Sequence, residues 1–332
     1  MKRLLSLLLI AVLFLSGCSS TAETLSFESM DTFMQVSLYG DKKTAEAVRD
    51  EILRLDALFN ANDPDSRVSE LNRSGFVEDA DVFRVLEGAL TVCQSTDGAL
   101  DPSVYPLVEE WGFISRDFHI PDRATIDELL QNVDHTQIAL NYNRTYIPEK
   151  MKLDLGAVAK GYAADRAKEI LAENEVTSAI LNLGGTVAAV GAKPDGSDWK
   201  VGISDPESTG GYFATVNLRD KIVATSGSYE RYFEQDGKRY CHILDPKTGM
   251  SADSGVVSVS IISENGLYCD ALSTALFVMG AEKAQAYWKN QQDLPPFDYI
   301  LLDEAGKVYV TGGVEITLTD KEKYEVVEVS GK

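Results

Sequence analysis

The chain of 332 residues carries 52 acidic and 31 basic side chains, which gives a net charge of −21 at neutral pH. Binding of nucleic acid requires clustered lysine and arginine to neutralise phosphates. We therefore expect no nucleic-acid partner. The length suffices for one large domain or two closely packed ones.

The first 18 residues have the features of an export signal. They begin with basic residues, continue with an apolar run and end in Ser16, Gly17 and Cys18. This pattern resembles a bacterial lipoprotein signal (residues 1–18), in which Cys18 becomes the lipid-bearing N-terminus. It predicts an extracytoplasmic protein that is lipid-anchored to a bacterial membrane. Residues 19–27 would form a tether, and residues 28–332 the folded domain. The alternative is an ordinary signal peptide with an incidental cysteine.

Apolar periodicity and turn residues predict the elements of the domain. In chain order, helices are expected at 43–59, 81–95, 123–132, 156–174, 270–279 and 281–291. Strands are expected at 33–39, 178–191, 199–204, 212–218, 221–227, 238–245, 256–262, 299–303 and 307–314, with a hairpin around 142–144. Helices and strands are segregated rather than alternating, which indicates an α+β fold.

Three cysteines follow Cys18, at positions 93, 241 and 269, and their spacing matches no zinc site. A disulfide between Cys241 and Cys269 is one interpretation. Small buried thiols are the preferred one.

The common catalytic motifs are missing from the sequence: it has no Walker loop, no G-x-S-x-G elbow and no HExxH. The glycine pair Gly184–Gly185 lacks the rest of a dinucleotide fingerprint and is explained equally well by a tight strand exit. Lys160, within a small apolar run, is either a ligand contact or part of a solvated helix face.

Asp270 and Thr274 lie four residues apart in a predicted helix, so they share one face. A carboxylate and a hydroxyl on an apolar face form a pair of hard oxygen ligands suited to Mg²⁺. From spacing alone, a helix N-cap at Asp270 is favoured over this metal site.

His242 is a candidate acid or base, because imidazole titrates near neutral pH. A lone histidine on a strand is more often structural. His119 and His135 lie in segments that suggest no function.

Six motifs occur together and in a characteristic order. They read GALDPSVYPLVEEWGF (98–113), DLGAVAKGYAAD (154–165), LNLGG (181–185), ATSGSYERYF (224–233), HILDPKTG (242–249) and DALSTALFVMG (270–280). In this combination the chain resembles the FAD:protein FMN transferase (ApbE) family from about Met30 to Gly280.

The resemblance implies a single α+β catalytic unit of the tunnelling-fold type, with FAD in a cleft and Mg²⁺ at its pyrophosphate. Such an enzyme moves FMN from FAD onto a threonine or serine of an exported acceptor protein, and AMP leaves. The partners implied are therefore FAD, Mg²⁺, an acceptor flavoprotein and the membrane that holds the anchor.

The resemblance also assigns residues. His242 and an aspartate, Asp154, are candidate catalytic bases, and Gly156 lets the backbone approach the nucleotide. The implied FAD contacts are Met30, Asn62, Ala99, Leu100, Asp101, Asp154, Lys160 and Leu244. The implied metal ligands are the backbone carbonyl of Ala157 and the side chains of Asp270, Thr274 and, more weakly, Ser273.

Departures from the family pattern affect the turn, the flavin contact and the reaction. Asp31 replaces a glycine, Leu100 replaces an aromatic residue, and Ser273 stands at an often acidic position. Asn62 stands where the transferases usually have an aromatic residue, which can cover adenine by stacking. The alternative enzyme is thus a Mg²⁺-dependent FAD pyrophosphatase that gives FMN and AMP. A lipid-anchored FAD-binding protein without turnover is the non-enzymatic alternative.

Overall fold

The computed structural model describes residues 21–208 and 210–331. The predicted signal peptide and Cys18 therefore lie outside the described residues. Within the described part of the chain, no helix is both long and apolar enough to cross a membrane.

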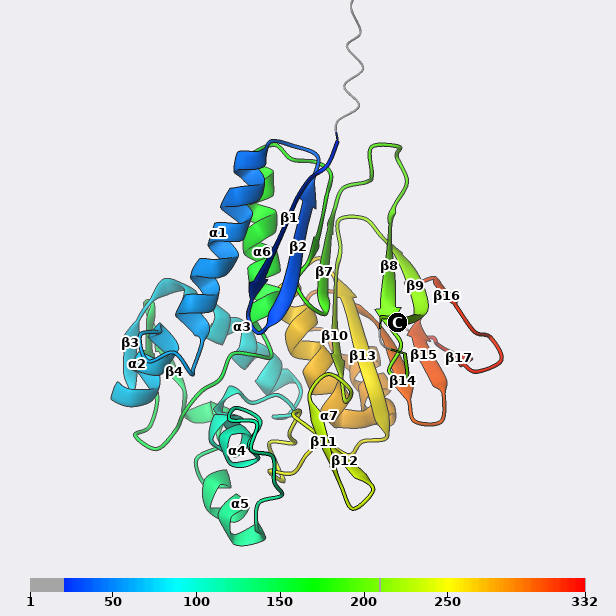
Figure 1. Cartoon of the computed structure of the whole chain (residues 1–332). Coiled ribbons are helices and arrows are strands. Elements are labelled where there is room, and N and C mark those ends of the chain that lie inside the picture. The colour runs from blue at the N-terminus through cyan, green and yellow to red at the C-terminus, as the bar shows by residue number, and fades with distance from the viewer. Residues whose placement is uncertain (1–20, 209, 332) are drawn as a thin grey trace, which may run out of the picture.

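A nine-stranded sheet forms the centre of the protein (Figure 1). Neighbouring strands are antiparallel, apart from the parallel pair β15 and β17 at one edge. In spatial order the strands are β1 (Glu23–Ser29), β2 (Thr32–Leu38), β6 (Ala179–Asn182), β7 (Thr186–Val190), β10 (Ile222–Gly227), β13 (Val256–Ser263), β14 (Asp298–Asp303), β15 (Lys307–Thr311) and β17 (Glu325–Val329).

Helices and three small sheets surround this central sheet. The helices are α1 (Lys42–Phe59), α2 (Arg67–Ser74), α3 (Ala80–Ser95), α4 (Tyr105–Glu110), α5 (Arg123–Leu130), α6 (Ala159–Glu173) and α7 (Gly266–Asn290), with 3-10 turns η1 (Pro102–Val104) and η2 (His135–Gln137). The small sheets are β16 (Ile316–Leu318), β9 (Tyr212–Leu218) and β8 (Trp199–Ser204); β3 (Phe76–Glu78), β5 (Arg144–Tyr146) and β4 (Ala139–Asn141); and β11 (Tyr232–Gln235) with β12 (Lys238–Cys241).

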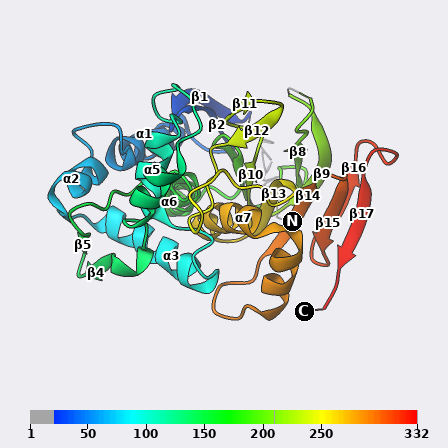
Figure 2. The same ribbon diagram turned by 90° about the horizontal axis from the view of Figure 1, so that it is seen from below.

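The two faces of the central sheet pack into separate apolar cores. On β14, Tyr299 and Leu301 join the core beneath the helices, whereas Ile300 and Leu302 join the core beneath β8, β9 and β16. This alternation follows from the two-residue period of a strand. In Figure 2 helices gather at the left and β8, β9 and β16 at the right. The α+β class is thus confirmed.

Most predicted helices are confirmed, and their starts have a local cause. The Asp41 side chain caps α1 by accepting a hydrogen bond from the backbone N–H of Thr44 at 2.8 Å. Asp79 and Asp122 cap α3 and α5 in the same way.

The predicted strand 178–191 is wrong, because it is a hairpin of β6 and β7. The chain turns between them at Gly184 (φ 69°) and Gly185 (φ 92°), left-handed values that glycine adopts at no steric cost. The tight-exit interpretation of this glycine pair is therefore confirmed.

The helix that carries Asp270 begins earlier than predicted. Asn265 caps α7 by accepting from the N–H of Tyr268, so Asp270 lies in the second turn. The N-cap interpretation of Asp270 is wrong for this reason. The predicted break before residue 281 is confirmed, since Gly280 has non-helical torsion angles (φ 81°, ψ 165°).

Several smaller predictions also need correction. The strand predicted at 238–245 ends at Cys241, and residues 23–27, which the sequence analysis places in the tether, belong to β1. Cys93, Cys241 and Cys269 are free and buried, which confirms the thiol interpretation over a disulfide.

Helices α6 and α7 cross at two glycines, and this contact makes a stability prediction. A Cβ atom on Gly161 would lie 2.1 Å from the Gly266 carbonyl oxygen. Replacement Gly161→Ala should lower the free energy of unfolding by about 2 kcal/mol or more, because a backbone atom cannot rotate away. Urea unfolding with a constant m-value measures this loss.

Gly312→Ala is the matched control, since its Cβ would meet no atom within 4 Å. We expect its unfolding free energy to change by less than about 0.5 kcal/mol. Equal unfolding midpoints for the two variants would contradict the proposed helix contact.

Candidate active site

Titratable side chains from four motifs meet around Lys160. The positive charge of Lys160 acts on the pKa values of Asp154, Glu230 and Asp270, which lie in three different segments, and it also helps to lower the pKa of His242. Neighbouring charges have such effects only over short distances. The motifs that the sequence analysis singled out therefore converge on one site.

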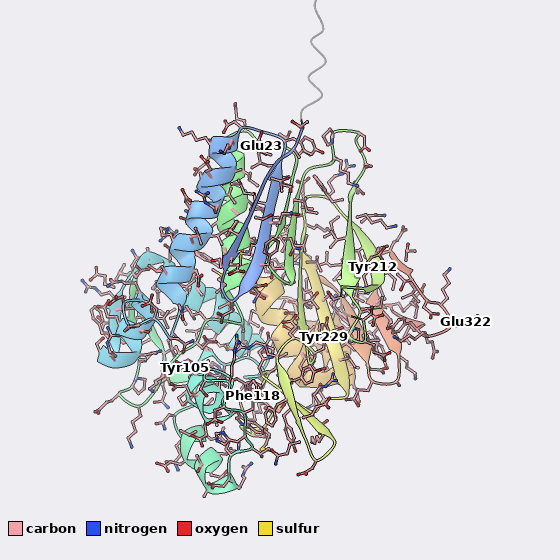
Figure 3. All side chains as sticks on the ribbon, in the orientation of Figure 1. Glu23, Tyr105, Phe118, Tyr212, Tyr229 and Glu322 are labelled. Carbon is pink, nitrogen blue, oxygen red and sulfur yellow. The ribbon has the colours of Figure 1, made fainter. Side chains whose placement is uncertain are left out.

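We call the surface around these side chains the recess, because they are surrounded by protein and are still reached by solvent. Burial raises the pKa of Asp154, and it raises the pKa of Glu230 to about 7. Yet Asp154 is partly accessible and Glu230 is exposed. Groups that are surrounded by protein but reached by solvent line a concave surface. Figure 3 labels Tyr105 and Tyr229, which lie beside Asp154 and Glu230 respectively.

The α6–α7 crossing forms the floor of this recess. Asp270 is 4% exposed, and its Oδ2 accepts the backbone N–H of Gly161 at 2.9 Å. Burial raises the pKa of Asp270, and the charge of Lys160 opposes that rise. In an uninterrupted helix the Gly161 N–H would bond to the Ala157 carbonyl. Among the described residues, no hydrogen bond reaches that carbonyl, so its oxygen is left available.

Ser273 and Thr274 are neighbours on α7 but differ in what they can reach. Ser273 is fully buried, and its hydroxyl donates to the Asp270 carbonyl at 2.7 Å and contacts the Ser226 hydroxyl at 2.7 Å. Thr274 is partly exposed and contacts Ser226 at 3.1 Å. We therefore remove Ser273 from the candidate metal ligands, because its side chain points into the core.

Asp154 and Lys160 flank the start of α6. The Asp154 side chain accepts the Gly156 N–H at 3.0 Å, and its own N–H donates to the Pro102 carbonyl at 2.9 Å. Lys160 is the second residue of α6, because this helix begins at Ala159 rather than at residue 156 as predicted. Both side chains are only partly exposed. Lys160 therefore does not lie on a solvated helix face.

Asp101 holds two loops together. Its carboxylate accepts from the N–H and hydroxyl of Ser103 and from the N–H and Nδ1 of His135, at 2.5–3.1 Å. Ala99 (8% exposed) and Leu100 (5%) are buried in the main core. The three side chains of this predicted FAD-contact segment thus support the local packing of the chain. His135, for which the sequence suggested no function, is part of this support.

His242 follows β12 directly and lies beside Arg231. Its backbone N–H donates to the Arg231 carbonyl at 3.0 Å, and its Nδ1 lies 3.2 Å from the same oxygen. Burial, together with the charges of Arg231 and Lys160, lowers the pKa of His242 to about 4. The imidazole is therefore neutral at pH 7. Leu244 is 5% exposed in a small core with Trp111.

Asn62 and Met30 lie in two further segments, the turn after α1 and the β1–β2 turn. Asn62 is exposed, and its side-chain oxygen accepts from the buried Tyr105 hydroxyl at 2.8 Å. Met30 and Asp31 form the two-residue β1–β2 turn, with φ values of 48° and 57°. Aspartate tolerates this left-handed conformation better than most residues, so the turn forms without glycine. Within this turn, the backbone N–H of Met30 donates a hydrogen bond to the Asp56 carboxylate at 2.8 Å.

Glu230 and Arg231 are the functional candidates that sequence reasoning missed. They lie within the quoted motif ATSGSYERYF, directly before β11. A Cβ on Gly185 would lie 3.6 Å from Glu230 Oε1, which brings the LNLGG turn to the same recess. The signal available in the sequence was this pair of adjacent acidic and basic residues within the motif.

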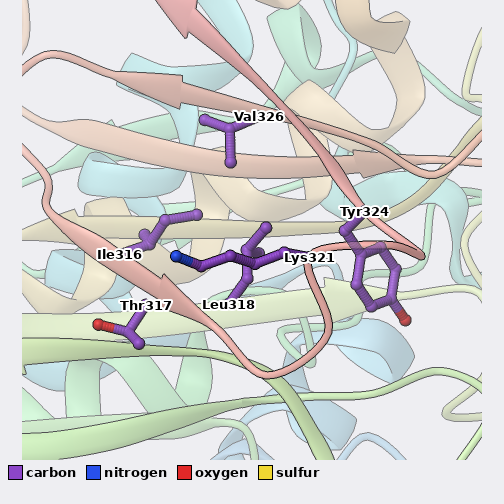
Figure 4. Close-up of a pocket in the computed structure, with 6 residues that line it drawn as sticks. All are labelled: Ile316, Thr317, Leu318, Lys321, Tyr324 and Val326. Atoms are coloured by element: carbon purple, nitrogen blue, oxygen red, sulfur yellow. The ribbon is translucent and has the colours of Figure 1, made fainter.

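Two surface grooves lie away from this recess. The first, about 430 Å³, lies beside β16 and β17 and is lined by Ile316, Thr317, Leu318, Lys321, Tyr324 and Val326 (Figure 4). The second, about 760 Å³, is bounded by α3, α6 and the start of α7. Neither groove is lined by any of the predicted site residues. The described residues also contain no group of three or more His, Cys, Asp or Glu side chains that could hold a metal by themselves.

An α+β unit with charged side chains gathered over a helix crossing defines the class as an enzyme of mixed architecture. Comparison with known proteins identifies it further. The chain belongs to the ApbE family, whose model matches residues 30–296.

Among curated proteins, the chain is 34% identical over 310 residues to the FAD:protein FMN transferase of Treponema pallidum, with 85% of each chain covered. Among solved structures, it matches the ApbE protein of Thermotoga maritima with a TM-score of 0.78 and 33% identity, covering 91% of this chain and 98% of that one. It also matches the flavinyl transferase ApbE of Pseudomonas stutzeri with a TM-score of 0.76 and 26% identity, covering 92% and 97%.

The contact between His135 and Asp101 predicts a pH-dependent contribution to stability. The hydrogen bond to Asp101 raises the pKa of His135, so the stabilisation is complete below pH 6.5 and is lost as pH rises through the folded-state pKa. We expect His135→Gln to lower the unfolding free energy by about 1–2 kcal/mol at pH 5.5 and by less than half of that at pH 8. Urea unfolding at both pH values tests this, and a larger loss at pH 8 would contradict it.

Proposed function

We propose that this protein is a Mg²⁺-dependent FAD:protein FMN transferase. It moves FMN from FAD onto the hydroxyl of a threonine or serine in an exported acceptor protein. The hydroxyl oxygen forms a bond to the FMN phosphorus, the P–O bond to the AMP phosphate breaks, AMP leaves and the hydroxyl proton passes to a base. The observation that carries the proposal is the meeting of Lys160 with Asp270, Thr274 and the available Ala157 carbonyl.

The three oxygen donors fit Mg²⁺. Asp270, Thr274 and the Ala157 carbonyl supply one carboxylate, one hydroxyl and one backbone oxygen, all hard ligands. Mg²⁺ is commonly held by one or two carboxylates together with water and substrate phosphates. The described residues offer no group of three acidic or histidine side chains here, so the remaining Mg²⁺ ligands would come from water and the pyrophosphate. When bound, the ion would neutralise charge on that pyrophosphate.

The residues around the ion would position the nucleotide. Lys160 contributes a positive charge beside the phosphates, and Asp154 and Gly156 shape the wall next to it. His242, neutral at pH 7, can accept the proton of the acceptor hydroxyl. Asp154 is the second candidate base, since burial raises its pKa above the ordinary value of an aspartate.

Asn62 supports a second candidate activity, hydrolysis of FAD to FMN and AMP. It is exposed at the recess and held by Tyr105, and its small amide cannot cover adenine as an aromatic ring does. Space left there admits water, which would compete with the acceptor hydroxyl.

The proposed setting is outside the cytoplasm. Residues 1–18 would be removed as a lipoprotein signal, and lipidated Cys18 would hold the domain at a bacterial membrane. β1 begins at Glu23, which leaves a short connection between the lipid and the fold. Acceptors would then be exported or membrane-bound flavoproteins.

The first test is one assay with two readouts. The form lacking residues 1–18 is incubated with FAD, Mg²⁺ and an acceptor domain that presents a threonine. We expect an acceptor mass gain of one FMN unit, lost with EDTA. Free FMN and AMP without a mass gain on any acceptor would instead establish the hydrolase. Tight FAD binding without turnover would leave a binding protein.

Neighbouring serine and threonine residues allow a matched test of the metal site. Asp270→Ala and Thr274→Ala should each weaken Mg²⁺ binding at least about tenfold in calorimetry with a non-hydrolysable dinucleotide. Ser273→Ala is the control and should bind Mg²⁺ within about threefold of the parent, because its side chain is buried. Equal affinities in all three variants would remove these residues from the metal site.

Asn62→Tyr should raise the ratio of FMN transfer to FAD hydrolysis, because an aromatic ring covers the adenine face and excludes water. The products are acceptor-bound FMN and free FMN, measured in the same reaction. An unchanged ratio would mean that Asn62 does not control access of water.

A further inference from the structure

Three segments meet at the base of the β11–β12 hairpin. Arg231 immediately precedes β11, His242 immediately follows β12, and Phe113 follows α4. The Arg231 Nη2 donates to the Phe113 carbonyl at 2.6 Å, and the Arg231 carbonyl accepts from the His242 N–H at 3.0 Å. The rings of Phe113 and His242 pack edge to face with centroids 6.3 Å apart. The three residues therefore form a closed triangle of contacts.

The Arg231 carbonyl decides which imidazole nitrogen carries the proton. A carbonyl oxygen only accepts hydrogen bonds, so Nδ1, at 3.2 Å from it, must be the N–H. In a neutral ring the lone pair is then on Nε2. No hydrogen bond to Nε2 is formed by the described residues, and the side chain is partly accessible.

We propose that Arg231 is a positioning residue. Its main chain fixes His242 as the Nδ1–H tautomer with Nε2 free to accept a proton, and its guanidinium anchors this arrangement to Phe113. The role of Nε2 as proton acceptor rests on the proposed transferase function, whereas the fixed tautomer does not.

The charge of Arg231 adds to the geometric effect. Arg231 and Lys160 are the charged groups whose positive charge disfavours a second proton on His242. Together with burial they keep the ring neutral across the physiological range. The arginine fork also suits the anchor, because it donates to a fixed carbonyl with little loss of rotamer freedom.

The test uses the full folded domain and the imidazole signals of NMR. The chain has three histidines, so long-range ¹H–¹⁵N spectra contain three ring systems, assigned with His119→Gln and His135→Gln. In the parent protein we expect a protonated Nδ1 and an unprotonated Nε2 on His242 above pH 6.

Two substitutions separate the charge from the anchor. Arg231→Met removes both, so the His242 titration midpoint should rise on the order of one pH unit and the Nε2–H tautomer should appear. Arg231→Lys keeps the charge, so the midpoint should stay low while the tautomers mix. If Arg231→Met does not fold, Arg231→Lys alone decides through its tautomer ratio.

Arg239→Met is the matched control on the same hairpin. Arg239 stacks over Tyr232 at 4.1 Å and pairs with Glu234, and its charge is not among those that act on the pKa of His242. Its removal should leave the His242 signals unchanged. Unchanged His242 signals in both Arg231 variants would overturn the inference.

Measurements of turnover distinguish a failure of this inference from a failure of the proposed function. If FMN transfer occurs, the acid limb of its pH profile should move upward in Arg231→Met and stay in place in Arg239→Met. If the parent shows neither transfer nor hydrolysis, the proposed function fails. The tautomer of His242 still decides the role of Arg231.

Discussion

The site depends on one close contact between two helices. Because Gly161 and Gly266 have no side chains, α6 and α7 approach until their backbones touch, and Asp270 reaches the N–H of Gly161. That hydrogen bond satisfies a buried carboxylate, which would otherwise be costly. It also removes the donor that the Ala157 carbonyl would have had. Because the Gly161 N–H donates to Asp270 instead of to the Ala157 carbonyl, the buried carboxylate is held and the carbonyl oxygen beside it is left available.

Local charge, rather than net charge, decides what the recess can bind. The protein carries a net charge of −21, which alone disfavours an anionic nucleotide. At physiological ionic strength, charges more than about 8 Å away are largely screened. Lys160 and Arg231 are close enough to act on the acidic side chains of the recess. The phosphates of a nucleotide would meet these cations, and a divalent ion would add to them.

Aromatic packing supports the histidine side of the site. An isolated two-stranded hairpin such as β11–β12 is at best marginally stable. Here Phe233 stacks with Tyr240 at 5.3 Å and with Phe118 at 5.5 Å, and Trp111 packs beside Tyr240 at 5.7 Å. These contacts fix the hairpin against the segment that follows α4. Arg231 and His242, which lie at the base of the hairpin, are therefore held in place as well.

The sequence by itself determined the α+β class, most helices and strands, and the family. Hydrophobic periodicity shows which face of an element is buried, and motifs in a characteristic order show the family. Both are read from the sequence without knowledge of long-range contacts. It did not separate Ser273 from Thr274, because one residue of helix rotation decides which hydroxyl faces the core. It did not give Asp101 its role as a clamp on His135, or show that Glu230 and Arg231 join Lys160. Only the tertiary structure decided these, because each depends on contacts between segments far apart in the chain.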